Sequence, residues 1–322
     1  MSLSVASLVA GLAVLSALVE GALAWRALSW LRRRVSGPVL DKESARLRHR
    51  AVQAQADAAL AAGAGLGAAA LLTGAAGPVA GLMAAVLIRA LWTWPWPRRV
   101  WRDLVLMLPL AGLVGMVQTP LALWAGWCVL VLWREVMPPG GRRLIPFRVM
   151  EGFETFLSDE GNASGQLNGR AEGILWNQRV VLNQTLAEAL PPEQLAAVVA
   201  HEAGHLRHRH REWFALWRLA LGGLAVWLVR DPVLLVLALP VLALWVKPLE
   251  SLMIRRWEHE ADAFAMAQAG ADSFGLALER LYGANASAPE PEPVWALFHH
   301  PHPVPLRRLA STKVGVAGTE PR

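Results

Sequence analysis

The chain has a single cysteine, Cys128, and only three lysines among its 31 basic residues. A lone cysteine excludes an intrachain disulfide, and its place in an apolar run indicates a small buried side chain. The sequence contains no internal repeat, no glycine loop of the kind that binds phosphate and no serine nucleophile elbow, so it does not favour nucleotide binding or serine hydrolysis. Abundant alanine with so little lysine is typical of a GC-rich bacterial genome.

Apolar residues are abundant instead. They make up 55% of the 322 residues, and the mean hydropathy is +0.35, which is more than a soluble domain usually carries. Seven apolar segments approach or reach the roughly 20 residues that span a bilayer. One lies in residues 3–25, two in 58–94, two in 104–133, and one each in 213–229 and 233–246. We therefore expect a mainly α-helical, polytopic membrane protein, although each short segment taken alone could be the core helix of a soluble domain.

The arginines predict how the chain is oriented in the membrane. No basic residue precedes the first apolar run, and basic clusters follow it at 26–50, 98–102 and 142–148. If the other segments pair as hairpins, these clusters share one side, which the positive-inside rule makes cytoplasmic. The formal charge of +6 is then explained by anionic lipid headgroups and not by nucleic acid. We expect a bacterial inner-membrane protein with its N-terminus outside.

A candidate metal site begins with the pattern His201-Glu202-Ala203-Gly204-His205. Residues four apart share a helix face, so His201 and His205 can bind one ion. Glu202 would border an open coordination position on that ion, and the small residues Ala203 and Gly204 leave room there. Prolines at 191 and 192 and apolar residues at helical spacing predict the helix. The pattern indicates a zinc peptidase with Glu202 as the base. The alternative is an exposed helix that carries two histidines.

A second cluster, Glu258-His259-Glu260-Ala261-Asp262, follows 53 residues after His205. On a helix, Glu258 and Asp262 lie one turn apart on one face. Glu258 would complete a site of two histidines and one glutamate, which favours zinc, and Asp262 would orient a ligating imidazole. Glu260 and His259 are competing ligands, and a solvated acidic face is the alternative to any site.

A third cluster is the histidine- and proline-rich segment 298–308, whose prolines prevent a regular helix until about Leu306. A histidine or arginine from this segment could stabilise the oxyanion that forms when water attacks a peptide carbonyl. The alternative is a basic surface turn. We expect residues 311–322 to be a loose tail.

Alternating apolar and polar residues in 147–156 and 174–182 predict a small antiparallel sheet. Zinc peptidases commonly hold an extended substrate against such a strand, and the candidate edge is Gly173, Ile174, Leu175 and Trp176. The predicted organisation is an N-terminal multi-span membrane region at 1–135, a first peptidase part at 136–212, a transmembrane hairpin at 213–248 and a second peptidase part at 249–322.

Together, HEAGH, a membrane hairpin, EHEAD and HPVPLRR resemble the integral-membrane zinc metallopeptidases that include the type I CAAX prenyl proteases and the HtpX-type proteases. The resemblance covers roughly residues 180–309. It implies a gluzincin-type domain with one Zn²⁺ per chain, held by His201, His205 and Glu258. It also implies Glu202 as catalytic base, Asp262 behind the ligands, and His302 and Arg308 at the substrate or oxyanion, with His300 as the alternative to His302. His205 to His210 matches the longer HExxHxxxxH form of the CAAX proteases.

The implied partners are the bilayer and a polypeptide substrate that is itself membrane-associated. The N-terminal membrane block matches neither branch, so the resemblance gives no particular substrate. A signalling peptidase of the BlaR type fits as well. The rival from another class is a non-catalytic scaffold or sensor in which zinc braces two helices, but a structural zinc site favours four protein ligands and does not require Glu202.

Overall fold

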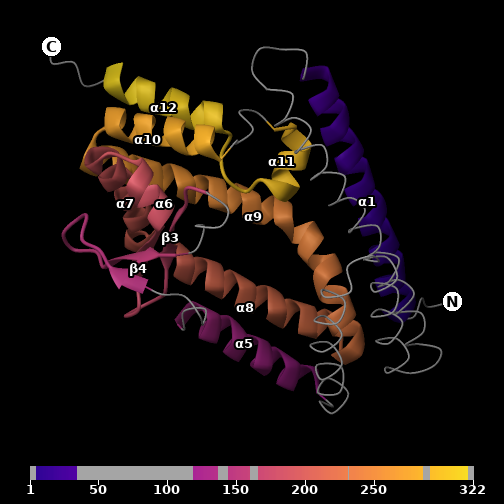
Figure 1. Ribbon diagram of the computed structural model, residues 1–322. Helices are drawn as coiled ribbons and strands as arrows, with labels where there is room; N and C mark the ends of the chain where they lie inside the picture. Colours follow the sequence, from indigo (N-terminus) through magenta and orange to yellow (C-terminus); the bar gives the residue numbers. More distant parts are fainter. Residues whose placement is uncertain are drawn as a thin grey trace. The chain divides into compact units, whose positions relative to one another are not determined.

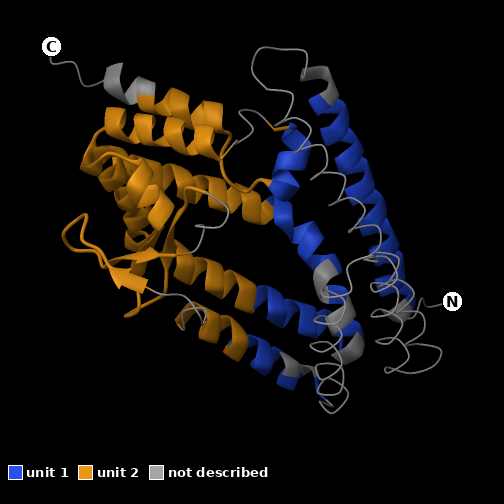
Figure 2. Ribbon diagram, viewed as in Figure 1, with its two compact units in different colours: residues 1–128, 220–248, 292–299 blue, residues 129–219, 249–291, 300–322 orange. Residues whose placement is uncertain are grey.

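The computed structural model describes residues 5–34, 119–136, 144–159, 166–230, 232–285 and 291–317. Within them the chain is mainly helical with one small sheet, as predicted (Figure 1). It divides into two compact units (Figure 2): unit 1 holds residues 1–128, 220–248 and 292–299, and unit 2 holds residues 129–219, 249–291 and 300–322. The predicted apolar segments in 58–94 and 104–118 lie outside the described residues.

Unit 1 contains α1 (Val5–Arg34) and α11 (Pro293–His299), together with parts of α5 (Pro120–Val136), α8 (His210–Leu228) and α9 (Pro232–Ala269). Trp295 of α11 is buried against Leu23, Ala24 and Ala27 of α1. Two ion pairs join α1 to the same segment, Arg26 with Glu292 just before α11 at 2.7 Å and Glu20 with His299 of α11 at 2.9 Å. The short helix α11 is therefore fixed to α1 by both apolar and charged contacts.

Among the described residues, one helical stretch has the length and apolarity of a membrane span. It is Ser7–Leu31 in α1, 25 residues with a mean hydropathy of 1.9. The predicted hairpin arms 213–229 and 233–246 coincide with parts of α8 and α9, apart from Val229, which follows the last residue of α8, so both segments are helical. The number of helices that cross the membrane stays a prediction.

Unit 2 contains the sheet, built from β1 (Leu144–Pro146), β2 (Thr155–Ser158), β3 (Gly169–Glu172) and β4 (Arg179–Asn183) in the order β1-β2-β4-β3. The prediction of a purely antiparallel sheet was wrong, because β2 and β4 pair in parallel. After β2 the chain runs to the outer edge as β3 and turns back as β4. β4 lies beside β2, so the two strands point the same way.

The predicted edge strand was also misplaced. Residues 173–176 form the turn between β3 and β4, and the edge strand is Gly169–Glu172. Gly173 has a φ of +81°, and a Cβ there would lie 1.7 Å from the Asn177 carbonyl oxygen. Leu175 has a φ of +56°, which a side chain disfavours. Two left-handed residues so close together end the extended conformation, whatever the β propensity of Ile174 and Trp176.

The helix α7 (Pro192–Arg207) carries HExxH and packs on the sheet (Figure 1). It begins as predicted, with Pro191 as its N-cap and Pro192 in its first turn, where a missing N–H costs no hydrogen bond. Its apolar face buries Leu195, Val198 and Val199 against the sheet residues Val180 and Leu182. This packing fixes the face of α7 that carries the two histidines.

Two helices of unit 2 approach closely at Gly204. A Cβ at this position would lie 3.0 Å from the Cα of Ala261 on α9, closer than ordinary van der Waals contact. From the sequence, Gly204 was expected to leave room beside the open coordination position. The structure instead places it between α7 and α9, where it lets α9 bring its acidic residues to the histidines.

The C-terminal part of unit 2 is helical. α10 (Ala271–Ala284) and α12 (Pro305–Ala317) lie side by side (Figure 1). The start of α12 agrees with the proline argument, but the prediction of a loose tail from residue 311 was wrong as far as residue 317. Thr312 is buried beside Gly275 of α10, so helix packing orders this segment. A short helix, α6 (Gln184–Ala189), precedes α7.

Candidate metal centre

His201 and His205 lie one turn apart on α7, and Glu258 reaches them from α9. Glu258 Oε2 lies 3.6 Å from His201 Nε2, and Glu258 Oε1 lies 3.5 Å from His205 Nε2. Ligand atoms at about 2.0–2.1 Å from a tetrahedral zinc ion lie about 3.4 Å from one another. Two imidazoles and one carboxylate at these separations therefore fit zinc.

Asp262 and Arg308 form a buried ion pair behind His201. Asp262 Oδ1 lies 2.9 Å from His201 Nδ1, and Arg308 Nε donates a hydrogen bond of 2.9 Å to Asp262 Oδ2. Arg308 Nη1 also lies 3.3 Å from Glu258 Oε2. Since Asp262 engages Nδ1 of His201, the Nε2 atom is left facing Glu258.

Both carboxylates are held in the ionised form. Burial alone would raise the pKa of the Glu258 carboxyl, but its interactions with His205 and His302 outweigh burial and hold that pKa well below its ordinary value. The pKa of Asp262 is lowered in the same way, because His201 and Arg308 outweigh its burial. Two anions under 5% exposed thus face the histidines at neutral pH.

His302 comes from the loop before α12, and its Nδ1 lies 2.8 Å from Glu258 Oε1. His300 takes a different role, since its carbonyl oxygen accepts a hydrogen bond from Arg255. Of the two candidate histidines, the structure places His302 at the site. It joins Arg308 there, and both side chains border the cavity in front of the ligands.

The other ring nitrogen of His205 contacts a further histidine. His205 Nδ1 lies 3.0 Å from His210 Nδ1, and His210 Nε2 lies 3.0 Å from Glu260 Oε2. Burial lowers the pKa of His210 to about 4 despite the nearby Glu260. Glu260 also accepts a hydrogen bond from Arg256, so its carboxylate faces away from the metal position, and His259 is exposed.

Glu202 lies against the sheet edge. Its Oε2 accepts a hydrogen bond of 2.7 Å from the Ala171 N–H, and Arg211 Nη1 donates one of 3.0 Å to the Ala171 carbonyl. The Asn168 carbonyl accepts a hydrogen bond from the Asn183 N–H at the end of β4. In an antiparallel pair, successive residues point their main-chain groups alternately toward and away from the partner strand, so those of Gly169 and Ala171 point away from β4. The edge strand therefore presents its unpaired side to Glu202.

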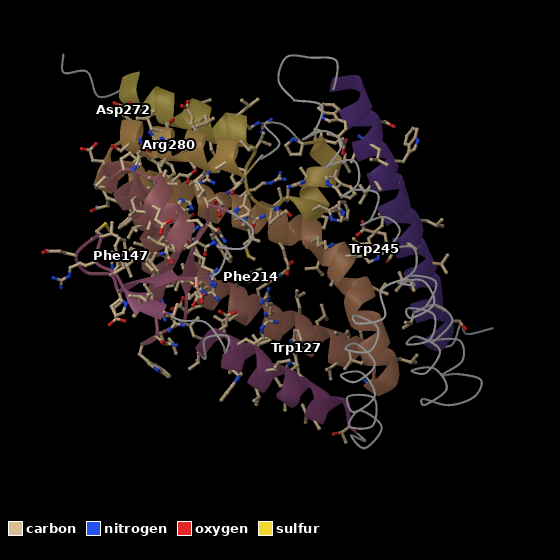
Figure 3. All side chains as sticks on the ribbon, viewed as in Figure 1. Trp127, Phe147, Phe214, Trp245, Asp272 and Arg280 are labelled. Atoms are coloured by element: carbon tan, nitrogen blue, oxygen red, sulfur yellow. The ribbon has the colours of Figure 1, made fainter. Side chains whose placement is uncertain are left out.

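A cavity of about 700 Å³ in unit 2 joins these groups. One wall carries His201, Glu202, His205, Glu258, His302 and Arg308, and a second is the edge segment 167–171. A third wall includes Phe214 of α8 (Figure 3) and Trp257 of α9, whose rings meet edge to face with centroids 6.3 Å apart. An extended polypeptide could enter between polar and aromatic surfaces.

The structure brings together every predicted metal-site residue: His201, Glu202, His205, Glu258, Asp262, His302 and Arg308. Their individual roles stay predictions. The predicted substrate residues Gly173, Ile174, Leu175 and Trp176 are absent from the cavity lining, and Trp176 is 81% exposed in the β3–β4 turn. The predicted contact between substrate and residues 173–176 is therefore not supported by their position.

Sequence reasoning missed three contributors to the cavity. The strand Gly169–Glu172 has no β-branched or aromatic residue, so nothing in its composition marks it as a strand. Arg211 seemed to be one of several basic residues near a membrane segment. Tyr282 of α10 also borders the cavity, and burial raises the pKa of its hydroxyl. The count of one tyrosine in the chain was the only signal that could have drawn attention to it.

Comparison with known proteins gives the following matches. A family model described as Peptidase family M48 matches residues 150–314. A CAAX prenyl protease 1 homolog of Arabidopsis thaliana is 32% identical over 180 residues, covering 48% of this chain and 42% of that protein. A probable CAAX prenyl protease 1 of Schizosaccharomyces pombe is 27% identical over 178 residues, covering 48% of this chain and 37% of that protein. The matched region is thus less than half the length of these curated relatives.

Among solved structures, the crystal structure of S. mikatae Ste24p superposes with a TM-score of 0.73. The match covers 97% of this chain and 100% of that one, at 15% identity. At this identity the match establishes a shared fold. The matched family confirms the resemblance drawn from the three sequence motifs.

Proposed function

The chain belongs to peptidase family M48, and on that premise we propose that it is a membrane-embedded zinc metalloendopeptidase acting on membrane or membrane-proximal proteins. Members of this family are zinc metalloproteases. The observation that carries the proposal is the meeting of His201, His205 and Glu258 at zinc-ligand separations, with Glu202 beside them at an open sheet edge.

His201, His205 and Glu258 would hold the ion, which would supply Lewis acidity to lower the pKa of a water molecule and polarise the scissile carbonyl. Glu202 takes the proton of the attacking water and gives it to the leaving amine. The hydrogen bond from Ala171 aims the Glu202 carboxylate at the cavity. Three protein ligands leave a coordination position for water, as in catalytic zinc sites.

His302 and Arg308 would stabilise the oxyanion of the tetrahedral intermediate. Both border the cavity, and both are anchored by Glu258. Because Arg308 is also held by Asp262, its guanidinium does not need to reorganise during the reaction.

The substrate would pair with the edge strand Gly169–Glu172, and this assignment replaces residues 173–176. Gly169 and Ala171 have outward main-chain groups and line the cavity next to Glu202. In the structure, Ala171 bonds to Glu202 and Arg211. An arriving substrate strand would therefore pair first through Gly169.

A membrane location is supported by Ser7–Leu31 and by the apolar character of the whole chain. We place the multi-span region in residues 1–135 and the hairpin in 213–248, with the peptidase parts at 136–212 and 249–322 facing the cytoplasm of a bacterial inner membrane. The basic residues that flank the apolar segments favour this orientation.

The test compares detergent-purified wild-type protein with Glu202→Gln on an unfolded model protein, with metal content measured in parallel. We expect about one zinc per chain in both proteins, and cleavage that a chelator abolishes in wild type alone. Cleavage by Glu202→Gln would refute the role of Glu202. Zinc in both proteins without cleavage by either, including on a membrane-anchored substrate, would favour the scaffold or sensor.

A further inference from the structure

His205 is the first member of a hydrogen-bonded chain that leads away from the metal position. The chain passes from His205 through His210 to Glu260, with two contacts of 3.0 Å, and ends at Arg256, which pairs with Glu260 at 3.0 Å. We infer that His210 and Glu260 are positioning residues that fix the tautomer and orientation of His205 for zinc. The inference rests on the proposed function and adds two residues to it.

The contact between His205 and His210 does not follow from helix geometry. In a continuous helix, residues five apart point about 140° away from each other. Here α7 ends at Arg207 and α8 begins at His210, so the helix is interrupted between the two histidines. The interruption turns the chain back and brings His210 onto His205.

Arg209 makes this turn at an energetic cost. Its φ is +58°, which lies in the left-handed region that residues with a side chain rarely adopt. A glycine at this position would avoid the strain. Strained residues persist where the surrounding structure requires their conformation, and here that conformation places the His210 ring beside His205.

The contacts determine which ring nitrogen of each histidine carries the hydrogen. His205 presents Nε2 to the metal position, so its Nδ1 carries the hydrogen and donates to His210 Nδ1. His210 must then carry its own hydrogen on Nε2, which donates to the Glu260 carboxylate. Every donor meets an acceptor, and the negative end of the chain makes His205 a more basic ligand.

The two ligating histidines would thus have unequal supports. The Nδ1 atom of His201 contacts Asp262 directly at 2.9 Å, whereas the Nδ1 atom of His205 is linked to the Glu260 carboxylate through His210. The His210 ring is 4% exposed and stacks on Trp257, with ring centroids 5.1 Å apart and planes at 13°. Such stacking holds the ring plane, and the two hydrogen bonds set its rotation within that plane.

The test measures the zinc dissociation constant of detergent-purified full-length protein by competition with a chromophoric chelator. His210→Phe keeps a ring that can stack on Trp257 but removes both hydrogen bonds, and we expect zinc to bind about 10–100-fold more weakly. His210→Gln can still accept from His205 and donate to Glu260, so it should bind zinc nearly as tightly as wild type. The matched control is His208→Phe, an exposed histidine in the same turn whose ring stacks on His210 with centroids 5.5 Å apart, because phenylalanine keeps this stacking and leaves both hydrogen bonds of His210 in place.

Glu260→Ala provides an independent variant on α9, at a side chain that is 35% exposed, and it should also weaken zinc binding. Unchanged zinc affinity in both His210→Phe and Glu260→Ala would overturn the inference. Equal loss in His210→Phe and His210→Gln would also overturn it, because ring packing would then explain the effect. If wild type binds no zinc, the proposed function itself fails.

Discussion

The close approach of α7 and α9 at Gly204 makes a specific prediction about stability and metal binding. Gly204→Ala adds one methyl group at the point where the two helices meet. Ordinary contacts between carbon atoms are about 3.5–4.0 Å, but the new Cβ would lie 3.0 Å from the Ala261 Cα and 3.2 Å from the Phe264 Cβ. Neither neighbour is the end of a flexible side chain, so the helix itself has to move.

Two opposing effects determine the size of the change. Replacing a helical glycine by alanine stabilises a helix by about 1 kcal/mol. Overpacking an already tight contact costs about 1–3 kcal/mol. We therefore expect a net loss of stability of between about 0 and 2 kcal/mol. Since α9 carries Glu258, its displacement should also weaken zinc binding.

The control is Gly283→Ala in α10, where a Cβ would meet no atom within 4 Å. This variant gains helix propensity without a clash and should be up to about 1 kcal/mol more stable than wild type. Thermal unfolding in detergent and zinc content would be measured for both variants. If Gly204→Ala raised the unfolding temperature as much as Gly283→Ala and kept its zinc affinity, the helices would not be in tight contact at Gly204.

Three further predictions follow from other parts of the molecule. Arg308→Met removes the cation between two buried carboxylates, Asp262 and Glu258, and should lower the free energy of unfolding of the metal-free protein by about 3–5 kcal/mol. Thermal unfolding with chelator present measures this, and a decrease below about 1 kcal/mol would contradict the ion pairing. Leu175→Gly removes the side chain from a residue in the left-handed conformation, so it should leave the free energy of unfolding unchanged or raise it by up to about 1 kcal/mol in the same assay. A clear decrease in the free energy of unfolding would contradict the turn geometry. Trp176→Ser changes an exposed side chain away from the cavity, so kcat/KM for an unfolded protein substrate should not change, and a tenfold fall would restore the original substrate assignment.

The metal site could be predicted from sequence because its residues depend on local helix periodicity. His201 and His205 are four apart, as are Glu258 and Asp262, so each pair occupies one face once its helix forms. Their meeting depends on how α7 and α9 pack. Sequence alone suggested this meeting through the family resemblance, and the structure adds its physical basis at Gly204.

The sequence pattern included His210, but its contact with His205 could not be predicted from it, and neither could the edge strand, because each depends on non-local structure. Gly169–Glu172 is extended through its pairing with β4, and the side chain of Asn285, which follows the distant α10, accepts a hydrogen bond from the Leu167 N–H just before the strand. The apolar run Ile174–Trp176 is more typical of a strand but follows a left-handed glycine. His210 reaches His205 through the left-handed Arg209, a conformation that arginine does not indicate.

Arg308 also has a consequence for how the enzyme is made. Its guanidinium contacts both Glu258 and Asp262, and Asp262 in turn contacts His201, so the protein itself supplies a positive charge to the two buried carboxylates. Many small metal-binding domains fold only when the metal arrives. In this chain, insertion and folding can be complete before metal delivery, and loading becomes a late step of biogenesis. The same arginine lowers the electrostatic attraction of the site for a metal cation.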